Sequence, residues 1–190
     1  MKHLIIVSLL SVFITSEAQD QGSTTPKEKF SVGIGYGFNS NIGNDGILFS
    51  NDYKHYLTDR LVMNPGISFF QSVNMFQNIA RNGYKSHSGL VFDLSLECSI
   101  YNHKYFNIAL NLGPSFEIGD ISYSSMRTYE NGVLTEERFV HKQIYEPGVS
   151  GSVEFSWDRN KKLVKTLSII SNSQYGLIPN SIGILYKIGF

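Results

Sequence analysis

Apolar and polar residues alternate along several stretches of this chain with a period of two. In residues 181–190 every second side chain is apolar, namely Ile182, Ile184, Tyr186, Ile188 and Phe190. Residues 30–38 and 89–101 alternate in the same way. Because successive side chains of a β-strand point to opposite faces, each stretch predicts a strand with one strongly apolar face.

The same pattern predicts eight strands, which run through residues near 30, 47, 61, 89, 105, 149, 163 and 181. The connections after the second, fourth and sixth strands are short, whereas those after the other strands are mostly longer. We expect residues 39–46 to form the first of the longer connections and residues 71–88 the second. This asymmetry is typical of antiparallel up-and-down barrels, with short periplasmic turns and longer outer loops.

Three local features of the sequence modify the predicted strands. Pro65 removes a ladder hydrogen bond from the third strand, so we expect a local bulge there. Asn131-Gly132, in the longest connection, is a strong hairpin signal, and it predicts that strands five and six continue past the bilayer as one tall hairpin. Alternation is weakest in residues 47–57, where we expect five side chains to point inward: Leu48, Ser50, Asp52, Lys54 and Tyr56.

Composition indicates which face of the barrel is outside. Charged residues make up 17% of the chain, below the roughly 25% of a typical soluble domain. The polar faces are mostly Gly, Ser and Asn, which are too small and too weakly charged for a solvent-exposed surface. The apolar faces carry aromatic residues near the turn-side strand ends, as in a membrane-interface girdle: Tyr105, Phe106, Trp157, Tyr186 and Phe190.

These observations predict an all-β fold, an eight-stranded antiparallel up-and-down transmembrane β-barrel with its apolar face in lipid. The opposite orientation, a soluble secreted lipocalin-like barrel that binds an apolar ligand, is the alternative. Alternation alone does not distinguish the two.

The N-terminus predicts export from the cytoplasm. Residues 1–18 have the features of a signal peptide: Lys2, an apolar core over residues 4–14, and small residues before a cleavage site after Ala18. The apolar core is too short to span a bilayer as a helix, which needs about 20 residues. We therefore expect a signal peptide over 1–18, a flexible leader over 19–29 and a barrel domain over 30–190.

The last strand resembles the closing strand of Gram-negative outer-membrane barrels, in which apolar residues alternate up to a terminal Phe. Here Tyr186, Ile188 and Phe190 carry that pattern. Together with the rhythm of the turns, it makes the mature chain similar to small porin-like barrels of the outer-membrane protein A type. The resemblance implies a place in the cell outer membrane, within the cell envelope. It also implies contact with outer-membrane lipid and recognition of the closing strand by the barrel-assembly machinery.

Charged residues on the inward faces form a further pattern. Strands two, four, six and eight each place one charge a few residues before a turn or the terminus: Lys54, Glu97, Glu154 and Lys187. They are expected at similar depth, and buried charges pair because unpaired ones cost several kcal/mol. The resemblance implies an ion-paired interior that blocks or gates the lumen. The alternative is four separate charges solvated by lumen water. Three more inward acids make the upper lumen acidic: Asp93, Glu117 and Glu146.

Evidence for catalysis in the sequence is weak. Some outer-membrane barrels deacylate lipid A with Ser, His and an acid near the outer rim, and Ser86-His87-Ser88 with Glu117 or Glu146 is the candidate here. The longer His/Ser/Asn pattern of those enzymes is absent, so we predict no enzyme and no catalytic residue. The remaining histidines lack metal-ligand spacing, and we expect no metal and no cofactor: His55, His103 and His141.

The remaining features exclude some partners and leave others open. Cys98 is the only cysteine, so the chain forms no intrachain disulfide, and the zero net charge argues against nucleic acid. Aromatic residues on the outer loops either bind a partner or pack within the hairpin: Tyr84, Tyr123, Tyr129 and Phe139. The predicted function is a structural or surface-interaction role through these loops, with an extracellular partner that the sequence does not identify.

Overall fold

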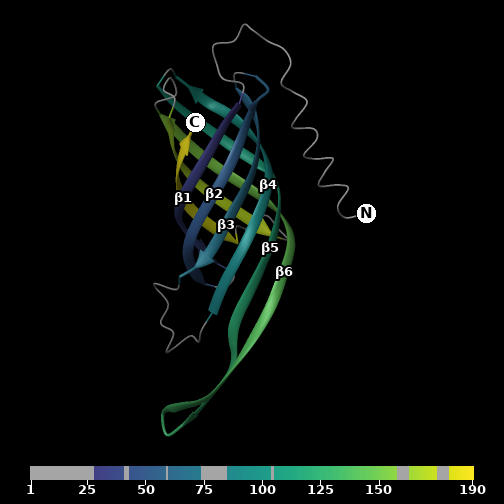
Figure 1. The fold of residues 1–190 in the computed structure, drawn as a ribbon, viewed down its shortest axis with the longest axis vertical. Coiled ribbons are helices and arrows are strands. Elements are labelled where there is room, and N and C mark those ends of the chain that lie inside the picture. The colour runs from purple at the N-terminus through teal and green to yellow at the C-terminus, as the bar shows by residue number, and fades with distance from the viewer. Residues whose placement is uncertain are drawn as a thin grey trace, which may run out of the picture.

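The computed structural model describes residues 28–40, 43–58, 60–73, 85–103, 105–157, 163–174 and 180–190. Eight antiparallel strands close into a ring in which each strand pairs with its sequence neighbours and the last pairs with the first (Figure 1). The strands are β1 Glu28–Asn39, β2 Asn44–Tyr56, β3 Leu61–Ser72, β4 Lys85–Asn102, β5 Phe106–Glu130, β6 Val133–Trp157, β7 Val164–Gln174 and β8 Ser181–Gly189. The predicted fold class is therefore confirmed. The proposed signal peptide, 1–18, and most of the leader lie outside the described residues.

The apolar faces of the strands form the outer surface of the barrel, as the alternation and composition predict. Along β8, Ile184 is 55% exposed, whereas its neighbour Leu185 is 1% exposed. The second strand also has the expected register, because Leu48, Ser50 and Asp52 are all buried. Large apolar side chains cover the outside of every strand, as lipid requires of a barrel. No helix within the described residues has the length and hydrophobicity needed to cross a membrane.

Strands β5 and β6 form the tall hairpin that Asn131-Gly132 predicts. Each strand has 25 residues, and both turn residues have positive φ, 54° and 80°, as a two-residue hairpin turn requires. Pairing with β4 ends at Tyr123, and pairing with β7 starts only at Gly148. Residues 124–147, which we call the outer hairpin, therefore extend beyond the ring, at the end of the barrel opposite the C-terminus (Figure 1).

Three local predictions were wrong. No bulge forms at Pro65, because β3 keeps one register with β2 on both sides of it, with Asp52 opposite Gly66 and His55 opposite Met63. Pro65 has no backbone N–H to donate, but the unbroken ladder with β4 on the other side holds the strand in place there. The expected turn over residues 39–46 is also shorter, since Asp45 and Gly46 pair with β1 as strand residues. The hydroxyl of Tyr36 donates to the Asp45 carboxylate and holds this extension. Strand β4 likewise begins at Lys85, inside the expected loop over residues 71–88.

Candidate functional site: the barrel lumen

The four inward charges predicted from the sequence lie together in the lumen. Lys54 Nζ lies 2.5 Å from Glu97 Oε2 and 2.5 Å from Glu154 Oε2. Lys187 Nζ lies 2.8 Å from Glu154 Oε1 and 2.7 Å from Asp52 Oδ2. The five side chains form a continuous series of ion pairs, Glu97–Lys54–Glu154–Lys187–Asp52, which we call the ion network.

Strand alternation explains why these residues meet. Each of the four predicted charges stands on a different descending strand, and each side chain points inward at a similar distance from the turn-side end. Glu154 is fully buried and accepts from both lysines, one at each carboxylate oxygen. In such a site a charge without its partner costs several kcal/mol. The pairing therefore holds the four strands at one relative height.

Asp52 belongs to the network although the sequence pattern did not single it out. It stands on β2 one inward position farther from the turn than Lys54, and its expected inward direction is correct. What the sequence did not show is that Lys187 reaches it across β1. The stagger of neighbouring strands around the barrel decides such contacts.

An apolar layer lies in the lumen on the outer side of the ion network. It consists of the buried side chains of Leu48, Phe70 and Leu185, with Ile170 packed against them. Gly37 and Gly183 provide the space for Leu48, since a Cβ at these positions would lie 2.7 Å and 2.3 Å from Leu48 Cδ1. Ser68 and Asn172 line both the cavity below this layer and the cavity above it, so polar groups accompany the apolar layer on one part of the wall.

A histidine and an acid lie on the outer side of the apolar layer. His87 is buried, its ring packs against Phe70 with 5.3 Å between centroids, and its Nδ1 lies 3.3 Å from Asn39 Nδ2. His87 Nε2 is 2.7 Å from Glu117 Oε1, a close contact that is not a well-aligned hydrogen bond. Glu146 stands opposite Glu117 on β6. The expected acidic residues of the upper lumen are therefore in place.

The serine–histidine candidate for lipid deacylation does not form as a unit. Ser86 and Ser88 flank His87 along β4, so their side chains point to the opposite face of the strand. His87 faces the lumen with Glu117, whereas the opposite face is the outer surface. This arrangement places no serine of the triplet beside the histidine that would activate it.

The closing strand joins the two ends of the sheet. Phe190 donates its backbone N–H to the Phe30 carbonyl and accepts from the Phe30 N–H, at 2.9 and 3.1 Å. The two rings meet edge to face, with 5.5 Å between centroids. Tyr186 and Ile188 point outward with Phe190. The position of these residues at the seam explains why the strand matters to closure; its recognition during assembly stays a prediction.

The other residues singled out from the sequence are dispersed. Cys98 is exposed on the outer surface, and His55, His103 and His141 lie on different strands or turns. Within the part of the chain that the structure describes, no group of three or more His, Cys, Asp or Glu could hold a metal ion. Of the outer aromatic residues, Tyr123, Tyr129 and Phe139 are exposed, and Tyr84 lies outside the described residues.

Ion pairs and hydrogen bonds stiffen the outer hairpin. Arg127 Nε donates to Glu137 Oε1 across the two strands at 2.8 Å, and Ser124 donates to the same carboxylate. The hydrogen bond from Arg127 to Glu137 raises the pKa of the guanidinium above its ordinary value. Closer to the barrel, Ser122 Oγ lies 2.6 Å from His141 Nδ1. The hairpin is therefore a defined ribbon rather than an irregular loop.

Comparison with solved structures shows the same fold in small outer-membrane barrels. The N-terminal β-barrel domain of Pseudomonas aeruginosa OprF is 10% identical, with a TM-score of 0.56 over 86% of this chain and 96% of that chain. A major outer membrane protein from Thermus thermophilus is 9% identical, with a TM-score of 0.55 over 86% and 98%. Neisserial surface protein A is 9% identical, with a TM-score of 0.51 over 85% and 93%.

No protein-family model matches the sequence, and no curated protein matches it. The structural likeness confirms the predicted resemblance to small eight-stranded outer-membrane barrels. The outer-membrane location that we expect agrees with this fold and with the apolar outer surface. At these identities the likeness concerns the fold alone.

Proposed function

We propose that this chain is a non-enzymatic outer-membrane protein that presents its outer hairpin to a partner outside the cell and keeps its lumen closed. One observation carries the proposal: residues 124–147 form a paired ribbon beyond the barrel, with pairing to β4 and β7 ending at Tyr123 and Gly148.

The outer hairpin has two features of an interaction surface. Within the described residues its strands pair only with each other, so each has one edge whose backbone groups can accept an added strand. It also exposes apolar side chains on and beside the ribbon, which is unusual in water without a binding role: Tyr123, Met126, Tyr129, Val133, Leu134 and Phe139. These residues favour the binding interpretation of the outer aromatics over packing within the hairpin.

The contents of the lumen support the proposed occlusion, and with it a surface role over conduction. Small cavities of about 50 and 30 Å³ lie on the two sides of the ion network, and the apolar layer lies outside the larger one. Eight strands enclose an interior that side chains just fill. Outer-membrane lipid on the apolar face and the assembly machinery at the closing strand complete the proposed partners.

The test replaces residues 125–138 by Asn-Gly, which joins the opposed residues Ser124 and Phe139 by a short turn. Cells that carry the full-length or the shortened chain are applied to surfaces coated with collagen, fibronectin or mucin. We expect the full-length chain to increase adhesion to at least one surface and the shortened chain to lose this gain. A faster gel mobility before boiling shows that the shortened barrel still folds. Equal adhesion of the two chains, or no adhesion above cells without the protein, contradicts the surface role.

A further inference from the structure

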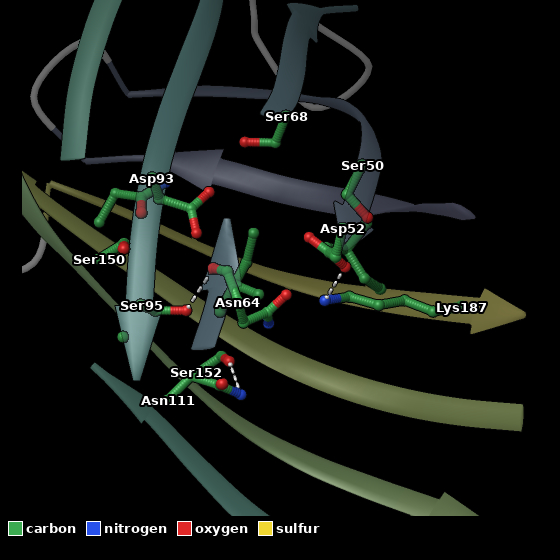
Figure 2. A pocket seen from close by; sticks show the side chains of 14 residues that line it. Ser50, Asp52, Asn64, Ser68, Asp93, Ser95, Asn111, Ser150, Ser152 and Lys187 are labelled. Carbon is green, nitrogen blue, oxygen red and sulfur yellow. Dashed lines mark hydrogen bonds and ion pairs between the residues drawn. The ribbon is translucent and has the colours of Figure 1, made fainter. Parts of the chain in front are cut away.

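A small polar chamber lies in the lumen between the ion network and the apolar layer. Its volume is about 50 Å³, room for a few water-sized groups. Figure 2 shows its polar lining, with side chains from several strands directed toward a common space. The lining includes Ser50, Asp52, Asn64, Asp93, Asn111 and Lys187.

Two carboxylates face each other across this chamber. Asp52 and Asp93 both stand opposite Gly66 in the ladders of β3 with β2 and β4. A Cβ at Gly66 would lie 2.9 Å from Asp52 Oδ1 and 2.8 Å from Asp93 Oδ1. Both Oδ1 atoms therefore lie over the glycine, where no side chain separates them. Asp52 Oδ2 is bound by Lys187 on the other side, which leaves Oδ1 directed toward Asp93.

Asp93 lacks a counterion. Within the described residues no ammonium, guanidinium or imidazole comes within ion-pair distance of its carboxylate, and no side chain or backbone group donates a hydrogen bond to that carboxylate. Together the ion network and the chamber contain two lysines and four acids: Lys54 and Lys187 against Asp52, Asp93, Glu97 and Glu154. A third lysine, Lys29, lines the cavity on the periplasmic side of the ion network, together with Glu97 and Glu154. It does not line the chamber, so the carboxylate without an ion-pair partner, Asp93, is on the chamber side, and a buried charge is not tolerated without compensation.

Neutral oxygen atoms around the chamber also lack partners. Ser50 Oγ, Asn64 Oδ1 and Asn111 Oδ1 are buried without a hydrogen bond, in residues that are 4%, 4% and 7% exposed. Nearly all buried polar atoms in proteins have a partner, so three in one cavity indicate a bound species. Amide and hydroxyl oxygens beside two carboxylates are electron-pair donors toward a cation.

We propose that the chamber binds a hard divalent cation of the calcium class, between Asp52 Oδ1 and Asp93. Calcium takes six to eight oxygen ligands in irregular geometry, including carboxylates, amide carbonyls and water. Two carboxylates are fewer than in many calcium sites, and the neutral oxygens and water complete the shell. No sulfur or imidazole lines the chamber, so softer transition metals are disfavoured. A cation at this point supplies the positive charge that Asp93 lacks.

The experiment measures calcium bound to the full mature barrel. The protein is refolded in lipid-free detergent with radioactive calcium, so that the ion enters before the lumen closes, and bound calcium is counted after equilibrium dialysis. The unfolding temperature with calcium and with a chelator gives a second readout. Asp93→Asn removes the unpaired carboxylate. Glu117→Gln is the matched control, because Glu117 is a buried lumen acid outside the chamber.

We expect one calcium per wild-type barrel and a higher unfolding temperature in calcium, both lost in Asp93→Asn and both kept in Glu117→Gln. Asn64→Leu removes the amide oxygen while it keeps the charge and the side-chain size. We expect this variant to weaken calcium binding several-fold. It tests the site if Asp93→Asn fails to fold. No bound calcium in the wild type means that water fills the chamber or that Asp93 holds a proton, and it overturns the proposal. Undiminished binding in Asp93→Asn or Asn64→Leu overturns it too, because the ion is then elsewhere.

Discussion

Replacing Lys187 by Met separates a true ion network from independently hydrated charges. Lys187 is buried and binds Glu154 and Asp52 at 2.8 and 2.7 Å. Methionine preserves the aliphatic chain that packs over Gly33, where the lysine Cγ fills the space of the missing Cβ. The substitution therefore removes the ammonium while changing the packing little.

The expected cost follows from what the two acids lose. Asp52 loses its only ion pair, whereas Glu154 keeps Lys54 at its other oxygen. Breaking a buried pair by removing one partner costs about 3–5 kcal/mol. Because Glu154 keeps one partner, we expect a value near the lower end, about 3 kcal/mol.

The measurement is urea unfolding of the folded barrel in lipid vesicles, followed by the fluorescence of Trp157, the only tryptophan, and by gel mobility without boiling. Lys142→Met, at an exposed lysine on β6, controls for the general effect of losing a positive charge. A change in unfolding free energy below about 1 kcal/mol, as for exposed pairs, would refute the buried network. It would support separate charges solvated by lumen water.

Three further predictions test the other features of the barrel. Leu48→Ala leaves a cavity in the apolar layer, so urea unfolding should show a loss of about 2–5 kcal/mol; an unchanged midpoint would mean that the layer is loosely packed. Phe190→Ala removes the ring that meets Phe30, and less protein should reach the fast-migrating folded form in membrane fractions, whereas equal amounts contradict a role in closure. Gly132→Val strains a residue with φ of 80°, so limited proteolysis should cut the outer hairpin faster while the barrel resists; an unchanged cleavage rate would show that the turn tolerates the side chain.

Local patterns in the sequence account for most of the architecture. Alternation with a period of two identifies the strands and the face of each residue, even on β2, where the pattern is weak. The Asn131-Gly132 pair identifies the hairpin because its turn type needs positive φ at both residues. The errors were also local: Pro65 was expected to force a bulge, and Asp45-Gly46 to form a turn. In both cases ladder pairing with a neighbouring strand prevailed over the residue's own preference.

The sequence by itself determined that the chain forms a barrel with an apolar exterior and that Lys54, Glu97, Glu154 and Lys187 point inward. Only the tertiary structure decided which inward side chains touch. Asp52 joins the network, Leu48 meets Phe70 and Leu185, and Asp93 faces Asp52 over Gly66 because the stagger of strands in a closed barrel sets the height of each residue. Alternation specifies the face to which a side chain points. It carries no information about which residues of distant strands lie at the same level along the barrel axis.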